Sequence, residues 1–164
     1  MGLFSFLKGS GSDDLKKKET EAAKTAVDQA NQAAIQAIMH SQKVLSLENI
    51  VQNLNIPING LAIQLDGDTV TVNGSVATQA EKEKIVLALG NVNGIAAVDD
   101  QLTAENAEPE SSFYEVKSGD SLSKIAKAYY GDPMKYTVIF EANKPMLKDP
   151  DKIYPGQQLR IPKI

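Results

Sequence analysis

The sequence contains no cysteine, no tryptophan and one histidine, His40. Without cysteine the chain has no disulfide bond, no thiolate metal ligand and no thiol nucleophile. His40 lies among glutamine and serine with no second histidine, which does not make a transition-metal site. Asp99 and Asp100 are neighbours in a predicted strand and point to opposite faces, so paired-carboxylate catalysis is unsupported. We therefore expect a binding protein and not an enzyme.

The chain also lacks a long hydrophobic run and an excess of basic residues. Its net charge is -4 and its isoelectric point is about 5.0, whereas a nucleic-acid-binding domain normally carries a basic face. No apolar stretch approaches the roughly 20 residues that span a bilayer. The apolar residues 3–7 follow no basic segment and are too short for a secretory signal. We expect a cytoplasmic monomer that binds neither nucleic acid nor membrane.

Residues 19 to about 53 show the apolar spacing of a helix. In the first half the repeating residue is almost always alanine, which favours helix but buries little area. We expect that half to pack weakly or to be partly detached. The second half carries bulkier residues and should join a core. Helix-spaced apolar residues are Ala23, Ala26, Ala30, Ala33, Ala37, Val44, Leu47, Val51 and Leu54.

Two short alternating segments flank Asp66-Gly67, a dipeptide that favours a two-residue type I′ hairpin turn. Since side chains alternate between the faces of a strand, one face of this hairpin should be apolar. The expected cross-strand pairs are Ile63 with Val70 and Leu61 with Val72.

A second helix is predicted after the hairpin. Thr78 and Glu81 have the spacing of a capping box, in which each side chain accepts a hydrogen bond from the other residue's backbone N–H. Gly90 is expected to end this helix in the left-handed conformation. A third strand should follow over residues 95–102. The order of helix, hairpin, helix and strand predicts an α+β domain with helices on one face of the sheet.

The remaining residues predict a linker and a second small domain. Residues 103–112 have no apolar periodicity and contain three acids and a proline, so we place the domain boundary there. A short strand over residues 113–116, two helices separated by Gly131, Asp132 and Pro133, and a final strand after Pro155-Gly156 then predict a βααβ fold.

Motifs in both halves resemble known families. Residues 114–122, Ile139-Phe140-Glu141-Ala142-Asn143 and 153–162 are similar to the LysM family, whereas residues 70–76 and 94–100 are similar to the BON family. One BON module followed by one LysM module, after the start Met1-Gly2-Leu3-Phe4, resembles the bacterial cytoplasmic potassium-binding proteins. We accordingly divide the chain into an N-terminal segment docking on BON (1–18), a BON domain with an extended first helix (19–102), a linker (103–112) and a LysM domain (113–164).

The resemblance implies a potassium site made of backbone carbonyl oxygens. Such oxygens replace the hydration shell of potassium, whereas dense carboxylates favour calcium or magnesium. The turn over residues 90–95 suits this chemistry, because the last carbonyls of a helix lack intrahelical partners and carry the negative end of its dipole. An ordinary helix-end turn is the alternative interpretation. The implied ligands are the carbonyls of Leu7, Lys8, Ser10, Gly90, Val92 and Ile95, and ion capture would order the N-terminus and couple BON to LysM as a sensor or buffer.

The LysM resemblance implies a different ligand. LysM domains usually bind N-acetylglucosamine-containing glycans between two loops, which would make the chain a cell-envelope protein that binds peptidoglycan. We treat this as the less favoured alternative, because the sequence shows no export signal. An adaptor whose partner docks on the alanine-rich helix is a third interpretation. The glycan groove would be formed by Gly119, Asp120, Ser121, Leu122, Asn143, Pro145 and Met146.

Overall fold

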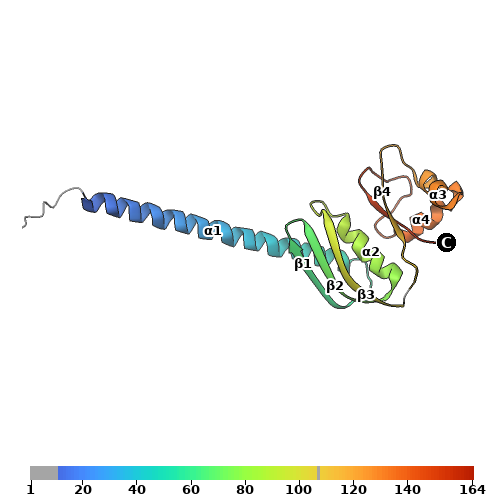
Figure 1. The fold of residues 1–164 in the computed structure, drawn as a ribbon, viewed down its shortest axis with the longest axis horizontal. Coiled ribbons are helices and arrows are strands. Elements are labelled where there is room, and N and C mark those ends of the chain that lie inside the picture. The colour runs from blue at the N-terminus through green and yellow to red at the C-terminus, as the bar shows by residue number, and fades with distance from the viewer. Residues whose placement is uncertain (1–10, 107) are drawn as a thin grey trace, which may run out of the picture. The chain divides into compact units, whose positions relative to one another are not determined.

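The computed structural model describes residues 11–106 and 108–164, with side chains from residue 16 onward. It confirms a mixed fold of helices and strands in which a three-stranded sheet precedes a two-stranded one (Figure 1). The elements are α1 (Gly11–Gln52), β1 (Asn59–Asp66), β2 (Thr69–Thr78), α2 (Gln79–Gly90), β3 (Ala97–Asn106), β4 (Ser112–Glu115), α3 (Leu122–Tyr130), the 3-10 turn η1 (Pro133–Lys135), α4 (Tyr136–Ala142) and β5 (Gln158–Ile161).

Helix α1 begins earlier than predicted, at Gly11, so residues 11–18 are helical. Every side chain from Lys16 to Lys43 is exposed, as expected for a stripe made mostly of alanine. The last turns differ, because Leu47 and Val51 are buried in the first core.

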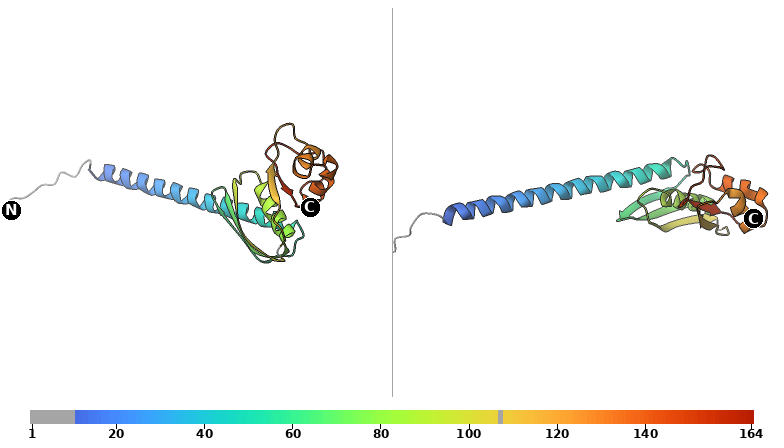
Figure 2. Two further views of the ribbon diagram at one scale, coloured as in Figure 1. Left: turned by 45° about the vertical axis from the view of Figure 1, so that its right-hand side comes forward. Right: turned by 90° about the horizontal axis from the view of Figure 1, so that it is seen from above.

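The three-stranded sheet has the order β1-β2-β3, with an antiparallel hairpin and a parallel β2–β3 pair. One face is apolar and packs against α2 and the last turns of α1, and both helices lie on this face (Figure 2). The other face carries mainly polar side chains. The residues that form the core are Leu47, Val51, Ile63, Leu65, Val70, Val72, Val76, Ile85, Leu89 and Leu102.

The predicted hairpin register is wrong by two residues. Ile63 pairs with Val72 and Leu65 with Val70, so the two turn residues are Gly67 and Asp68. Gly67 has a φ of 61° and Asp68 is not among the residues with positive φ, which is the pattern of a type II′ turn with glycine first. A shift of two residues keeps the same faces, because side chains alternate with period two.

Strand β3 continues through residues 103–106, which the sequence places in the linker. The added residues extend the parallel pairing with β2 as far as Thr78 and Asn106. Two side chains support the extension: Thr103 donates to the Gly74 carbonyl and Asn106 donates to the Ala77 carbonyl. These long-range contacts stabilise a segment that has little apolar content of its own.

The second small domain has the expected βααβ order, in which β4 pairs with β5 antiparallel. Ser121 caps α3 with its side chain, and Gly131 ends α3 in the left-handed conformation with a φ of 74°. Asp132 accepts a hydrogen bond from the Met134 N–H at the start of η1. A second core of buried residues fills this domain: Val116, Leu122, Ile125, Ala126, Ile139, Leu147, Leu159 and Ile161.

Candidate functional site

The candidate ion-binding loop is the turn over residues 90–95 between α2 and β3. Helix α2 starts at the predicted capping box of Thr78 and Glu81, whose reciprocal hydrogen bonds are both present. Gly90 is the last helical residue and is not left-handed, contrary to the prediction. Asn91 is the C-cap, with a φ of -87°, and its side-chain amide donates to the Leu87 carbonyl. The Asn91 N–H also donates to the Leu87 carbonyl and the Val92 N–H donates to the Leu89 carbonyl, each at 3.1 Å, so the last turn is closed by backbone bonds without a left-handed glycine.

Three backbone oxygens of the loop keep at least one lone pair that accepts no hydrogen bond from the described residues. The carbonyls of Gly90 and Ile95 accept no hydrogen bond from the described residues. The Val92 carbonyl accepts one, from the Ile95 N–H at 3.1 Å, and keeps a second lone pair. The three carbonyls implied by the family resemblance therefore lie in one turn at the negative end of α2.

Three residues fix the position of this loop against the first core and the hairpin turn. Val92 and Ile95 pack their side chains against the core. The Ala96 N–H donates to the Asp68 carbonyl at 2.8 Å, which connects the end of the loop to the hairpin turn.

Lys43 brings a positive charge close to the loop. A Cβ placed on Gly94, which has a φ of 86°, would lie 3.9 Å from the Lys43 ammonium nitrogen. Like charges repel, and this ammonium therefore lowers the attraction of the loop for cations. No pattern in the sequence predicted that Lys43 lies close to this loop.

Asn91 joins the candidate loop to the second small domain. Its side-chain nitrogen donates to the Gln158 carbonyl at 3.1 Å, and its side-chain oxygen accepts from the Gln158 N–H at 2.9 Å. Gln158 opens β5, so one amide side chain of the first domain binds the backbone of a strand in the second. The contact was not predicted from the sequence.

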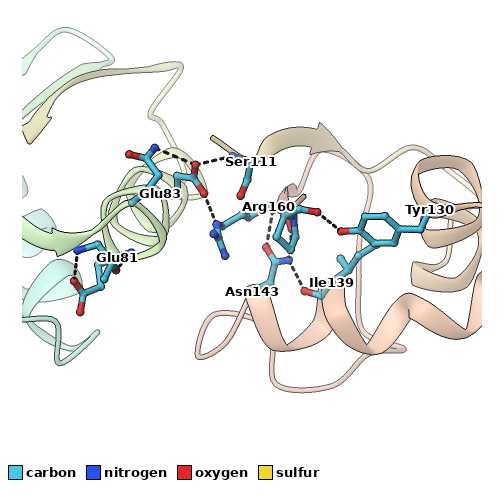
Figure 3. Close-up of polar contacts among 10 residues, drawn as sticks. Glu81, Glu83, Ser111, Tyr130, Ile139, Asn143 and Arg160 are labelled. Atoms are coloured by element: carbon cyan, nitrogen blue, oxygen red, sulfur yellow. Dashed lines mark hydrogen bonds and ion pairs between the residues drawn. The ribbon is translucent and has the colours of Figure 1, made fainter. Parts of the chain in front are cut away.

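A buried ion pair forms a second connection between the domains. Glu83 on α2 and Arg160 on β5 are 3% and 8% exposed and contact each other through Oε2 and Nε (Figure 3). The other carboxylate oxygen of Glu83 accepts from the Ser111 N–H at 2.7 Å and from the Gln79 amide at 3.1 Å. The carboxylate thus binds three parts of the chain at once, namely α2, the segment before β4, and β5.

These contacts set the ionisation of Glu83. Burial alone would raise the pKa of Glu83, but hydrogen bonds from Ser111 and Arg160 more than offset it and leave the pKa below its usual value. Glu83 is therefore charged at neutral pH, where it neutralises the buried guanidinium of Arg160.

Several residues predicted to line a glycan groove have side chains that form contacts within the βααβ domain. Asp120 accepts hydrogen bonds from the Tyr114 hydroxyl and the Lys117 N–H, and Ser121 caps α3. Leu122 belongs to the second core, and the amide of the buried Asn143 binds the backbone of α4 and β5. Gly119 and Pro145 are exposed, and Met146 is partly exposed.

The N-terminal ligands implied by the resemblance, Leu7, Lys8 and Ser10, lie outside the described residues. Of the implied ligands, Gly90, Val92 and Ile95 lie within the described residues, at the end of α2 and in the turn that follows it. Among the described residues, no cluster of three or more histidine, aspartate or glutamate side chains is arranged to hold a metal ion. Within the same part of the chain, no helix combines the length and hydrophobicity required to cross a bilayer.

Comparison with known families assigns both halves of the chain. The BON domain model matches residues 28–106, and the LysM domain model matches residues 114–162. The protein is thus a BON–LysM two-domain protein. It is 44% identical over 163 residues to the Potassium binding protein Kbp of Escherichia coli, with 99% of each chain covered. The chain belongs to the family of that protein.

A second relative matches only in part. An uncharacterized protein of Deinococcus radiodurans is 35% identical over 127 residues, which is 71% of this chain and 49% of that protein. The chain therefore spans about half of the length of this relative.

Proposed function

We propose that this protein binds potassium through backbone carbonyls, with Gly90, Val92 and Ile95 supplying one side of the site and Leu7, Lys8 and Ser10 the other. The observation that carries the proposal is the turn at the end of α2, where two carbonyls accept no hydrogen bond from the described residues and a third has a free lone pair. The relative named potassium binding protein supports the same ion.

Ligand chemistry favours a large monovalent cation at this turn. Carbonyl dipoles replace the weakly held water of potassium, as they do in channel filters. The negative end of the α2 dipole adds attraction without a full charge. In this proposal the protein is a cytoplasmic, monomeric sensor or buffer and has no catalytic role. Ion capture orders the N-terminal segment and strengthens the arrangement of BON and LysM.

The proposal predicts a potassium-specific gain in stability. A ligand that binds only the native state raises the free energy of unfolding by about 2.7 kcal/mol at a hundredfold excess over Kd. The melting temperature of the full chain should therefore be higher in potassium chloride than in sodium chloride at equal ionic strength. Equal melting temperatures in the two salts would refute the proposal.

Two glycine variants localise the effect. Gly94 in the loop and Gly67 in the hairpin turn both have positive φ, and neither position would crowd an added Cβ. A β-branched residue is strained at either site, so Gly94→Val and Gly67→Val should both lower stability. Only Gly94→Val should abolish the difference in melting temperature between potassium chloride and sodium chloride. Loss of the difference in both variants, or in neither, would argue against this loop.

Glycan binding by the LysM domain is a second candidate, which the family match over residues 114–162 favours. Three of the residues expected to contact the sugar, Gly119, Pro145 and Met146, remain at least partly exposed. Retention of the full chain on purified peptidoglycan would support this function. The potassium measurement is independent of that result.

A further inference from the structure

Strand β5 has two edges, and β4 covers only one of them. On the other edge, the peptide groups of Gln158 and Arg160 are bound by the side-chain amides of two asparagines, Asn91 and Asn143. Asn143 belongs to the LysM domain itself, whereas Asn91 belongs to the BON domain. The BON domain therefore completes the hydrogen bonding of a LysM strand.

The two asparagines use the same geometry. Each is the C-cap of a helix, Asn91 of α2 and Asn143 of α4. Each donates to the carbonyl four residues earlier, that of Leu87 at 3.0 Å or Ile139 at 2.7 Å. For Asn143 the distances to the Arg160 carbonyl and N–H are 2.8 and 2.7 Å, and for Asn91 the corresponding distances to Gln158 are 3.1 and 2.9 Å.

This pairing differs in kind from a surface hydrogen bond. The side-chain amide of Asn91 binds both the backbone N–H and the backbone carbonyl of Gln158, as a residue of a neighbouring strand would. It also binds its own helix, so both amide protons and the amide oxygen are used. A small displacement of the Asn91 backbone therefore breaks or strains three hydrogen bonds.

We propose that Asn91 is the positioning residue that couples ion occupancy of the 90–95 loop to docking of the LysM domain. This inference rests on the proposed function. Asn91 lies between Gly90 and Val92, whose carbonyls are the proposed ligands. Rotation of those peptide groups toward an ion moves the backbone that carries Asn91. Coupling is reciprocal, so a docked LysM domain in turn holds the loop in its ion-binding conformation.

The test uses amide resonances of the full chain, labelled with ¹⁵N, while potassium replaces sodium at constant ionic strength. Val92 and Ile95 report on the loop, and Leu159 and Ile161 report on β5. In the wild type, both sets should shift with the same potassium midpoint. In Asn91→Ala the loop should still respond with Kd raised about five- to tenfold, and the potassium-dependent shifts of β5 should disappear.

Asn93→Ala is the matched control. Asn93 lies in the same loop, is exposed, and forms no backbone hydrogen bond with β5 in the described part of the chain. It should leave both sets of shifts and the Kd unchanged. Asn91→Ser keeps a polar cap, but its hydroxyl lies near the position of the asparagine Cγ, one bond short of the atoms that contact Gln158, so this variant should behave as Asn91→Ala does.

The outcomes separate the two proposals. Persistence of potassium-dependent β5 shifts in both Asn91 variants would overturn the coupling and leave the potassium site intact. A wild-type loop that does not respond to potassium would overturn the proposed function and the coupling with it. Loss of β5 shifts in Asn93→Ala would also overturn the assignment to Asn91.

Discussion

Glu83 and Arg160 are charged side chains that are almost inaccessible to water. Taking two charges out of water is costly, and this cost is offset only where the remaining hydrogen-bonding groups are satisfied. Glu83 meets that condition through Ser111 and Gln79. No buried side-chain polar atom in the described part of the chain lacks a partner. The pair therefore favours one arrangement of α2 and β5, since a displaced partner would leave a buried charge uncompensated.

Removal of the Glu83 charge should destabilise the protein in a pH-dependent way. Glu83→Gln leaves Arg160 buried without its partner, which costs about 3–5 kcal/mol at neutral pH. The pKa of Glu83 is lowered in the folded state, so its contribution is complete above the unfolded value of about 4.3 and is lost as pH falls through the folded pKa. Denaturant unfolding from pH 7 to pH 3 should show the gap between wild type and variant closing below about pH 4.3.

Glu108→Gln is the control for that measurement, because Glu108 is exposed. It should follow the wild type over the whole range. A gap for Glu83→Gln that stays constant with pH would contradict the assigned role of its carboxylate.

At the scale of elements, features that depend on neighbouring residues were predicted correctly, whereas the pairing of strands was not. The capping box at Thr78 follows from two residues three positions apart, and the structure contains both of its hydrogen bonds. The hairpin register depends on which two residues form the turn, and both Asp66-Gly67 and Gly67-Asp68 place a glycine where positive φ is needed. Composition alone could not decide between them.

The extension of β3 into the expected linker has a similar cause. Residues 103–106 have no apolar periodicity, so the sequence indicates no strand there. Their pairing comes from β2, about 28 residues earlier, through backbone and side-chain bonds such as that of Asn106 to Ala77. Such tertiary contacts override local preference.

Helix α1 should respond differently to changes in its two halves. Ala30 is exposed, so Ala30→Pro should reduce helicity by breaking the helix locally without lowering the melting temperature of the folded domains. Leu47 is 2% exposed, so Leu47→Ala should cost about 2–5 kcal/mol by leaving a cavity. Far-ultraviolet circular dichroism and thermal melts measure both effects. A large drop in melting temperature for Ala30→Pro would show that this half of α1 is packed against a partner.

At the scale of the whole molecule, the sequence predicted two domains but not how they contact each other. Asn91 and Gln158 are 67 residues apart, and Glu83 and Arg160 are 77 apart. Nothing local distinguishes these four residues from other polar residues, so the interface could be found only from the structure. The candidate loop was named in advance because the family resemblance implies ligands there, and the local pattern, a helix end followed by asparagine and glycine, suits such ligands.

The interface should make the two domains unfold together. Each domain has its own core, and the polar contacts of Glu83 and Asn91 connect them. In differential scanning calorimetry the wild type should unfold in a single transition, whereas the double variant Glu83→Gln/Asn91→Ala should show two. The double variant Glu108→Gln/Asn93→Ala serves as the control and should retain one transition. A single transition in the interface variant would mean that cooperativity has another source.

The two asparagine side chains bound to the free edge of β5 have a consequence for self-association. An exposed strand edge invites pairing with a strand of another chain, which leads to aggregation. Asn143 protects the Arg160 end of the edge permanently, but Asn91 protects the Gln158 end only while the BON domain stays in place. Conditions that separate the two domains would therefore expose an unpaired strand edge at Gln158. The form in which the BON and LysM domains remain in contact should be the one that stays soluble at high concentration.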